Sequence, residues 1–233
     1  MRILAVDTAT KSCSVAVTEN ETVLGEITKV SEQTHSRHLL EMVQAVMSKT
    51  RLTLSDMDGF AVTRGPGSFT GLRIGISSVK GLALAVNKPV VGISSLQTLA
   101  QQIAPTSYLI CPLIDARKGE VYTSMYRWDT DALTPEHGER VLRPHEAVRN
   151  IHSHCIFVGN GAVLYRAFIM QRLGDLASFA PDDRHTIQAS TVAYLGLKRF
   201  ESGDAGEVAD LLPDYIRKSD AELNFSRKPA RNT

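Results

Sequence analysis

The sequence predicts a two-lobed α/β protein with a mixed β-sheet in each lobe. In residues 1–105, three strand-like segments precede an alternation of helix, strand, helix and strand. From residue 106 onward this order partly repeats, beginning again with an apolar run that ends in an aspartate. The order is that of a ribonuclease-H-like layer fold, and its repetition indicates two duplicated lobes that face each other across a cleft.

The composition is that of an ordinary globular chain. Its 233 residues, 43% hydrophobic and 22% charged, suffice for two lobes with real cores. The net charge of +1 gives no general attraction for nucleic acid, and the only local excess of basic residues lies after residue 216. No apolar run approaches the roughly 18 residues of a membrane span. Three separated cysteines without a CxxC pair predict a reduced, cytoplasmic protein.

The first lobe is expected to begin with a buried strand that ends at Asp7 and Thr8. Alternating segments supply two antiparallel partners, and apolar spacings of three and four predict a helix, with Thr34 or Ser36 as its candidate cap. A strand, a glycine motif, a second helix and a fifth strand complete the lobe. In chain order the expected elements are residues 3–6, 12–17, 22–27, 36–48, 59–63, 74–86 and 89–93.

The glycine motif is GPGSFTGLRIG, at residues 65–75. Glycines let a backbone adopt positive φ and approach a neighbour closely, and the helix that follows presents free N–H groups that suit an anion. The motif lacks the Gly-Lys-Ser/Thr ending of a nucleotide-binding P-loop. Two interpretations therefore stay open, a phosphate cradle and a tight structural turn, of which the turn is the commoner role.

The second lobe is expected to start after a boundary at residues 105–107, which gives domains 1–105 and 106–233. Its first strand ends at Asp115, and a later strand leads into Gly159 and Gly161. The expected elements are strands at residues 108–114, 121–126 and 155–158 and helices at 163–173 and 190–200. The last helix is expected to return to the first lobe, and residues from 221 onward to form a loose tail.

Several motifs together resemble the TsaB (YeaZ) family. They lie at residues 3–10, 35–36 followed by 39–40, 65–75, 94–96, 115–122 and 212–217. The resemblance implies an actin-like fold of the Hsp70 and sugar-kinase superfamily and a role in making threonylcarbamoyladenosine, the modified base beside the tRNA anticodon. It also implies a homologous catalytic partner, TsaD, which transfers threonylcarbamoyl from its adenylate to tRNA, and an ATPase, TsaE. Contact with tRNA is then expected only through the complex.

The comparison with TsaD implies that this chain holds no metal and no cofactor. TsaD binds a metal through a His-x-x-x-His pattern, and Ser95 and Leu99 occupy the corresponding positions here. A serine is a poor ligand and a leucine is none. His35 and His38 could share a helix face, but a site there would need further ligands such as Glu32 and Glu41. A solvated, polar helix entry is the simpler interpretation.

Seven residues are candidates for facing the cleft or a nucleotide: Asp7, Thr8, Gly65, Gly67, Asp115, Gly159 and Gly161. Paired aspartates hold magnesium–nucleotide in actin-like kinases, but neither Asp7 nor Asp115 is followed by a glycine-rich phosphate hairpin. The favoured role for each is a carboxylate at a strand end that accepts backbone hydrogen bonds. Ser68 and Thr70 have no histidine within the motif, so a serine hydrolase is discounted.

A partner surface is expected on the two helices of the first lobe. Gly71, Gly75 and Ser78 recur at spacings of four and three, which lets a second helix approach closely. The expected surface comprises Leu39, Leu40, Val43, Val46, Gly71, Gly75, Ser78, Val79 and Leu82. In isolation it would form a homodimer and, competitively, it would bind TsaD. The alternative is that this face is buried within the lobe.

The favoured function is a catalytically silent partner of TsaD. Two rivals from other classes remain, a metal-dependent glycopeptidase-like hydrolase and an actin-like small-molecule kinase. Bound metal would identify the first, and nucleotide binding the second.

Overall fold

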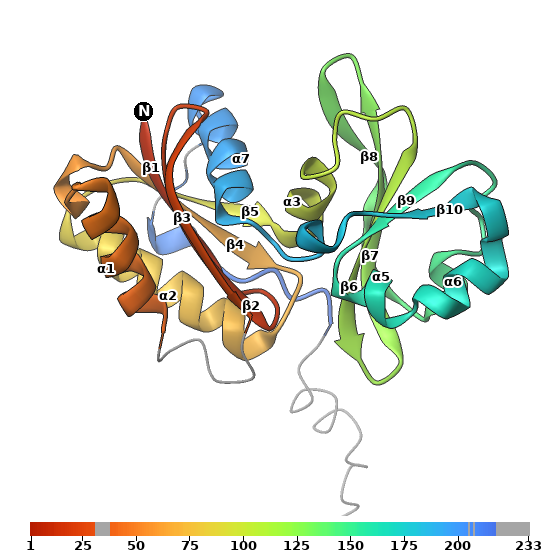
Figure 1. The fold of residues 1–233 in the computed structure, drawn as a ribbon. Coiled ribbons are helices and arrows are strands. Elements are labelled where there is room, and N and C mark those ends of the chain that lie inside the picture. Colours follow the sequence, from red (N-terminus) through yellow and green to blue (C-terminus); the bar gives the residue numbers. More distant parts are fainter. Residues whose placement is uncertain (31–37, 205, 207, 218–233) are drawn as a thin grey trace, which may run out of the picture.

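The computed structural model describes residues 1–30, 38–204, 206 and 208–217 and consists of two lobes side by side (Figure 1). The candidate cap at residues 34–36, the histidine at position 35 and the expected tail lie outside these residues. Each lobe is built on a five-stranded sheet, in the orders β3-β2-β1-β4-β5 and β10-β9-β6-β7-β8. Among the described residues, no helix combines the length and the apolar character needed to cross a membrane.

The first sheet contains β1 (Arg2–Asp7), β2 (Ser12–Glu19), β3 (Thr22–Val30), β4 (Gly59–Gly65) and β5 (Val90–Ser94). Strand β2 is antiparallel to both β1 and β3, while β1, β4 and β5 run parallel. Helices α1 (Leu39–Thr50) and α2 (Phe69–Ala85) cover one face and share a hydrophobic core with β1, β2 and β4. The expected order of elements in this lobe is confirmed.

The second sheet repeats the first. It contains β6 (Leu109–Arg117), β7 (Glu120–Asp129), β8 (Ala132–Leu142), β9 (Cys155–Val158) and β10 (Ala177–Phe179). Again the middle strand of the opening meander is antiparallel to its neighbours, and β6, β9 and β10 run parallel. Helices α4 (Pro144–Ala147), α5 (Asn160–Leu164) and α6 (Arg166–Leu173) belong to this lobe. The predicted duplication of ribonuclease-H-like lobes with mixed sheets is therefore confirmed.

Some elements differ from the sequence-based expectation. Strands β8 and β10 and helices α3 (Ser95–Gln101) and α4 were not expected, and the helix expected over residues 163–173 is interrupted at Tyr165. Short 3₁₀ turns lie at Leu54–Asp56, Gly174–Leu176, Asp182–Arg184 and Val208–Asp210. Strand β8 escapes prediction because it is mostly exposed, charged and contains Pro135, as an edge strand allows.

Two helices connect the lobes. Helix α3 (Ser95–Gln101) follows β5 of the first sheet but contacts β6 and β7 of the second, whereas α7 (Ala189–Glu201) follows the second sheet and lies on β1 and β2 (Figure 1). The backbone N–H of Ala189 donates to Ser14 Oγ at 3.0 Å, which anchors the start of α7 on the first sheet. One continuous hydrophobic core thus contains both Ile3 of the first lobe and Ile110 of the second, and it joins the two lobes.

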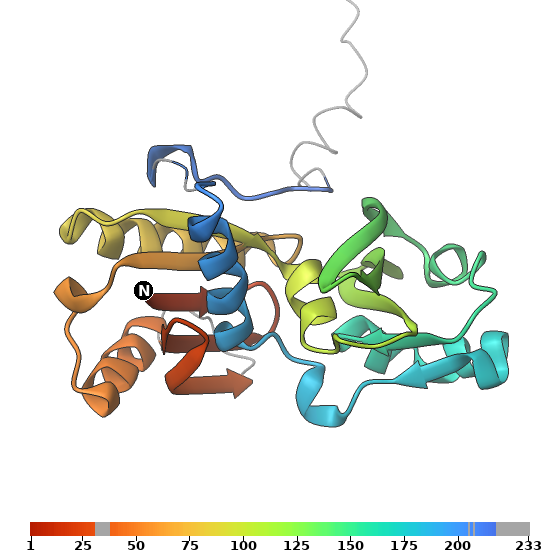
Figure 2. The same ribbon diagram turned by 90° about the horizontal axis from the view of Figure 1, so that it is seen from above.

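Residues 208–217, called here the C-terminal strap, cross from the first lobe to the second (Figure 2). Lys80 Nζ donates to the carbonyl oxygens of Ala209 and Leu211 at 3.0 and 3.2 Å. The Tyr215 ring stacks on Phe69 with centroids 4.7 Å apart. At the far end, Arg217 Nη1 lies 3.2 Å from Glu120 Oε2 in the second lobe. The strap therefore contacts both lobes.

Candidate functional site at the lobe junction

The glycine loop after β4, residues 65–68, is filled by the protein's own backbone. The N–H of Ser68 donates to the carbonyl oxygen of Ala9 at 2.7 Å, and a Cβ on Gly67 would overlap that same oxygen. Gly65 has φ +130° and leaves space for the carbonyl of Asp214 in the strap. Ser68 caps α2 by accepting the N–H of Gly71 at 3.3 Å. This geometry supports the structural-turn interpretation, because the turn after β1 occupies the space beside the loop.

Helix α2 presses its glycines against the end of β1. A Cβ on Gly71 would overlap the carbonyl oxygen of Thr8, and a Cβ on Gly75 would overlap Thr8 Oγ1. Thr8 Oγ1 donates to the carbonyl oxygen of Gly71 at 2.8 Å. Close approach of backbones is what glycine permits, so these two glycines fix the helix to its own sheet. Thr8 is fully buried between them.

Asp7 ends β1 in the centre of the first lobe and is fully buried. Its Oδ1 accepts the Thr63 hydroxyl at 2.8 Å and the N–H of Ala9 at 3.1 Å, as expected for a strand-end carboxylate. Its Oδ2 has no hydrogen-bond partner within the described chain. Burial outweighs these hydrogen bonds and raises the pKa of Asp7 to about 7. The carboxyl group therefore titrates near neutral pH.

The second lobe repeats this arrangement in a more open form. Asp115 Oδ1 accepts the N–H of Arg117 at 2.8 Å, and the N–H of Asp115 donates to Asn160 Oδ1 at 3.0 Å. A Cβ on Gly159 would overlap the carbonyl oxygen of Leu113, and one on Gly161 would lie 2.9 Å from it. Both expected glycines thus pack against β6, as Gly67 and Gly71 pack against the end of β1. Asp115 itself is only half-buried.

A polar cluster joins the lobes beside these loops. Ser94, at the end of β5, donates a short hydrogen bond to Glu139 on β8, and the Tyr126 hydroxyl lies 3.4 Å from the same Glu139 oxygen. Burial, and then the negative charge of Asp214 in the strap, raise the pKa of Glu139. Burial followed by the charge of Glu139 raises the pKa of Tyr126. Two lobes and the strap thus meet near one half-buried carboxyl group.

The expected partner surface needs correction. Leu39, Val43, Val46, Gly71, Gly75 and Val79 are buried within the first lobe, Ser78 and Leu82 are half-buried, and only Leu40 is largely exposed. The small-residue line faces Thr8 because α2 must approach β1 closely. The solvent face of α2 instead presents Ser77, Gly81 and Leu84, with Leu84 66% exposed.

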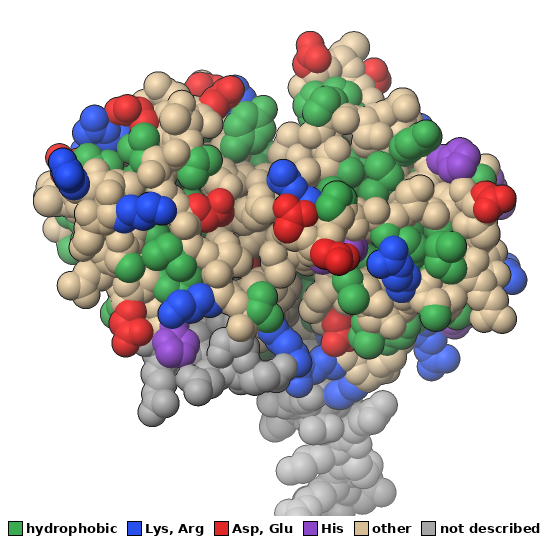
Figure 3. Space-filling model, viewed as in Figure 1, with side chains coloured by type: hydrophobic (Ala, Val, Ile, Leu, Met, Phe, Trp, Pro, Cys, Tyr) green, Lys and Arg blue, Asp and Glu red, His purple; other side chains and the backbone are tan. Residues whose placement is uncertain are grey.

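The face of the molecule seen in Figure 3 carries side chains of all types. In the space-filling view, hydrophobic, basic and acidic side chains are interspersed over both lobes, and a notch separates the lobes at the top (Figure 3).

The positions that would correspond to metal ligands lie inside the lobe junction. Ser95 and Leu99 are buried on α3, and Leu99 Cδ1 lies 3.0 Å from where a Cβ on Gly159 would be. His38 Nδ1 lies 3.5 Å from Glu41 Oε2, while residues 32 and 35 fall outside the described part of the chain. The described residues contain no group of three or more potential metal ligands.

Sequence reasoning missed Thr63 beside Asp7, and it missed Tyr126 and Glu139 at the junction. Thr63 looked like an ordinary strand residue, and Glu139 lies on the unexpected strand β8. The alternation of Tyr122, Ser124 and Tyr126 was a usable signal, since it marks the face of β7 on which Tyr126 lies. No local signal connects Ser94 with Glu139, which is 45 residues away.

Comparison with known proteins agrees with the motifs. A model of the TsaD family, described as tRNA N6-adenosine threonylcarbamoyltransferase, matches residues 17–225. The tRNA threonylcarbamoyladenosine biosynthesis protein TsaB of Bacillus subtilis is 30% identical over 97% of this chain and 98% of its own length. The Escherichia coli protein of the same name is 40% identical over 69% of this chain and 72% of its own.

Among solved structures, YeaZ from Pseudomonas aeruginosa has a TM-score of 0.78 at 30% identity. The alignment covers 92% of this chain and 99% of the YeaZ chain. The similarity therefore extends over both lobes and is not confined to the glycine motif.

Proposed function

The chain belongs to the TsaB (YeaZ) family of tRNA threonylcarbamoyladenosine biosynthesis proteins, and from this premise we propose that it is a non-catalytic partner of TsaD. Together with TsaE, it would support the transfer of threonylcarbamoyl from its adenylate to the adenosine beside the tRNA anticodon. One observation carries the proposal: Ser95 and Leu99, buried on α3, stand at the positions where the resemblance to TsaD places histidine ligands. Neither side chain can replace an imidazole.

The packing of the lobe junction supports the proposed non-catalytic role. The space beside the glycine loop is filled by the turn after β1, through the Ser68 N–H to Ala9 hydrogen bond of 2.7 Å. The continuous core and the strap hold the two lobes together. Two lobes held together in this way can present a fixed surface to another subunit. The residues of the proposed surface lie outside the junction. The proposal places the complex in the cytoplasm and gives this chain no direct tRNA contact.

The proposed surface is the exposed side of α1 and α2, carried by Leu40, Ser77, Gly81 and Leu84. Leu40 and Leu84 are 57% and 66% exposed, so each places a large apolar side chain in solvent. Ser77 and Gly81 lie on the same side of α2 and leave its backbone accessible to a second helix. In the absence of TsaD a second copy of the chain would cover this surface, since the two partners are homologous.

Leu84→Glu is expected to weaken association with TsaD at least tenfold while leaving the fold intact. The side chain is exposed, so the change costs little stability, but a charge buried unpaired in an interface costs several kcal/mol. Leu164→Glu is the matched control, because Leu164 is 58% exposed on the second lobe. Sedimentation of the mixed subunits measures both. Undiminished binding by the folded Leu84→Glu variant would place the interface elsewhere.

The purified protein is expected to retain no stoichiometric zinc or iron after dialysis. The reason is the replacement of both histidine ligands at Ser95 and Leu99. Elemental analysis measures the metal content per chain. About one metal per chain, lost in a His35→Ala, His38→Ala double variant, would favour the hydrolase alternative over the partner role.

A further inference from the structure

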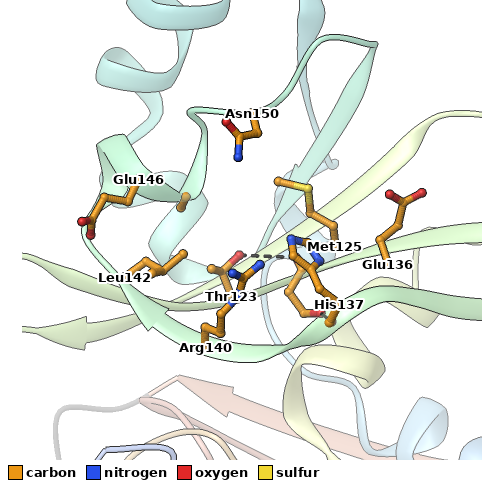
Figure 4. Close-up of a pocket in the computed structure, with 10 residues that line it drawn as sticks. Thr123, Met125, Glu136, His137, Arg140, Leu142, Glu146 and Asn150 are labelled. Atoms are coloured by element: carbon orange, nitrogen blue, oxygen red, sulfur yellow. Dashed lines mark hydrogen bonds between the residues drawn. The ribbon is translucent and has the colours of Figure 1, made fainter.

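The second lobe contains a cavity of about 230 Å³ between β7, β8 and α4 (Figure 4). Met125, Leu142 and Ala147 give it apolar walls, and these side chains belong to the hydrophobic core of the second lobe. Tyr126, the next residue along β7, belongs to the core that joins the lobes. The cavity therefore lies on the face of the second sheet away from the first lobe, and it has no part in the junction described above.

An irregularity in β8 brings two basic side chains to this cavity. Thr123 pairs with Arg140 and Met125 pairs with His137. A step of two residues along β7 therefore lies opposite a step of three residues along β8. Residues three apart in a regular strand point to opposite faces, and an extra residue restores them to the same face. His137 and Arg140 thus both line the cavity, while Glu139 between them reaches Ser94 at the lobe junction.

The hydrogen-bonding capacity left open in the cavity consists mainly of donors. The Arg140 side chain makes no ion pair or hydrogen bond with the described residues, and His137 Nδ1 is buried without a partner. Figure 4 shows the Asn150 side-chain nitrogen directed into the same space. Of the two carboxylates that line the cavity, Glu136 is paired with Arg127 at 2.7 Å, and one oxygen of Glu146 accepts the backbone N–H of Arg143 at 2.9 Å.

The His137 imidazole can supply a further hydrogen-bond donor to the cavity. Burial, followed by the charge of Arg140, lowers the pKa of His137. At pH 7 the ring is therefore neutral, and its buried Nδ1 carries a proton in one of the two tautomers. A guanidinium, an amide and an imidazole N–H that line one cavity form a combination that matches the oxygens of a carboxylate or phosphate.

We propose that this cavity binds a small anionic molecule, with its carboxylate or phosphate group on Arg140, Asn150 and His137 and its apolar part against Met125 and Leu142. Pockets for drug-sized ligands occupy about 300–1,000 Å³, so the ligand of this smaller cavity has the size of a simple metabolite. The inference is independent of the proposed partner role, since none of these residues lies on α1, α2 or the junction.

The test is a titration of the full chain, followed by NMR through the Asn150 side-chain amide and the His137 ring nitrogens. Butyrate and inorganic phosphate are the two anionic probes, and butyramide is the uncharged control of butyrate's size. We expect saturable shifts at both residues with an anion and none with butyramide. The anion that saturates at the lower concentration tells whether the site prefers a carboxylate or a phosphate.

Arg140→Gln is expected to weaken anion binding at least tenfold, because it removes the unpaired guanidinium. Arg149→Gln removes the same charge from an exposed residue that does not line the cavity, and is expected to change binding less than twofold. Asn150→Leu removes the amide donor and is expected to weaken anion binding independently of Arg140. The proposal is overturned if neither anion produces saturable shifts, if butyramide binds as tightly as butyrate, or if Arg140→Gln and Arg149→Gln bind equally.

Discussion

Gly71→Ala is expected to destabilise the protein by about 3 kcal/mol, the upper range for overpacking a closely packed core. A methyl group at this position would overlap the carbonyl oxygen of Thr8, a backbone atom that cannot rotate away. Either α2 must separate from β1, or the Thr8 hydroxyl must give up its 2.8 Å hydrogen bond to the Gly71 carbonyl. Chemical denaturation measures the loss in unfolding free energy, either from equilibrium unfolding curves or from the folding and unfolding rates.

Gly81→Ala is the matched control in the same helix. Nothing lies within 4 Å of a Cβ at Gly81, so this change should stabilise the helix by up to about 1 kcal/mol. Opposite signs for the two substitutions would locate the effect in the contact with Thr8. A Gly71→Ala protein as stable as the wild type would show that the glycine motif does not fix α2 to β1.

The stability of the wild-type protein is expected to fall as pH rises from 4 to 7, because of Asp7. Its pKa is raised from 3.8 in the unfolded chain to about 7 in the folded one, so the folded state holds a proton that the unfolded state has lost. The stabilisation is complete below pH 4 and disappears as pH passes 7. The slope approaches about 1.4 kcal/mol per pH unit, or about 4 kcal/mol over the interval.

Asp7→Asn isolates this contribution. The amide keeps an oxygen to accept the Thr63 hydroxyl and the Ala9 N–H, but it cannot ionise. The difference in unfolding free energy between Asp7→Asn and wild type should therefore grow in favour of the variant from pH 4 to pH 7. Thr63→Val removes a hydrogen bond that lowers the pKa of Asp7, so the decline should extend to higher pH. Parallel pH profiles for wild type and Asp7→Asn would contradict the assignment.

The first lobe could be predicted in detail because its signals are local. The buried strand before Asp7, the glycine motif and the apolar spacing of α1 each lie within a dozen residues, and the observed order agrees with them. The second lobe was predicted less completely. Strand β8 carries Pro135, Gly138 and several charges, and the three residues of β10 give no periodic pattern.

The expected partner surface shows that the spacing of residues along a helix does not by itself identify an interface. The spacing of Gly71, Gly75 and Ser78 identifies a narrow helix face, but it does not say whether that face meets the protein's own sheet or another molecule. The answer depends on Thr8, more than 60 residues earlier in the chain. The Ser94–Glu139 contact is equally non-local, since only the folded arrangement of β5 and β8 brings the two side chains together.

The central claim is that this chain supports TsaD and does not itself transfer the threonylcarbamoyl group. The most direct measurement is a reconstituted reaction containing TsaD and TsaE of the same organism, unmodified tRNA, ATP and threonylcarbamoyl-AMP, with the modified nucleoside measured by mass spectrometry. We predict modification with all three proteins and only background when either this chain or TsaD is left out. Modification by this chain without TsaD, or at full rate by TsaD and TsaE without this chain, would contradict the account.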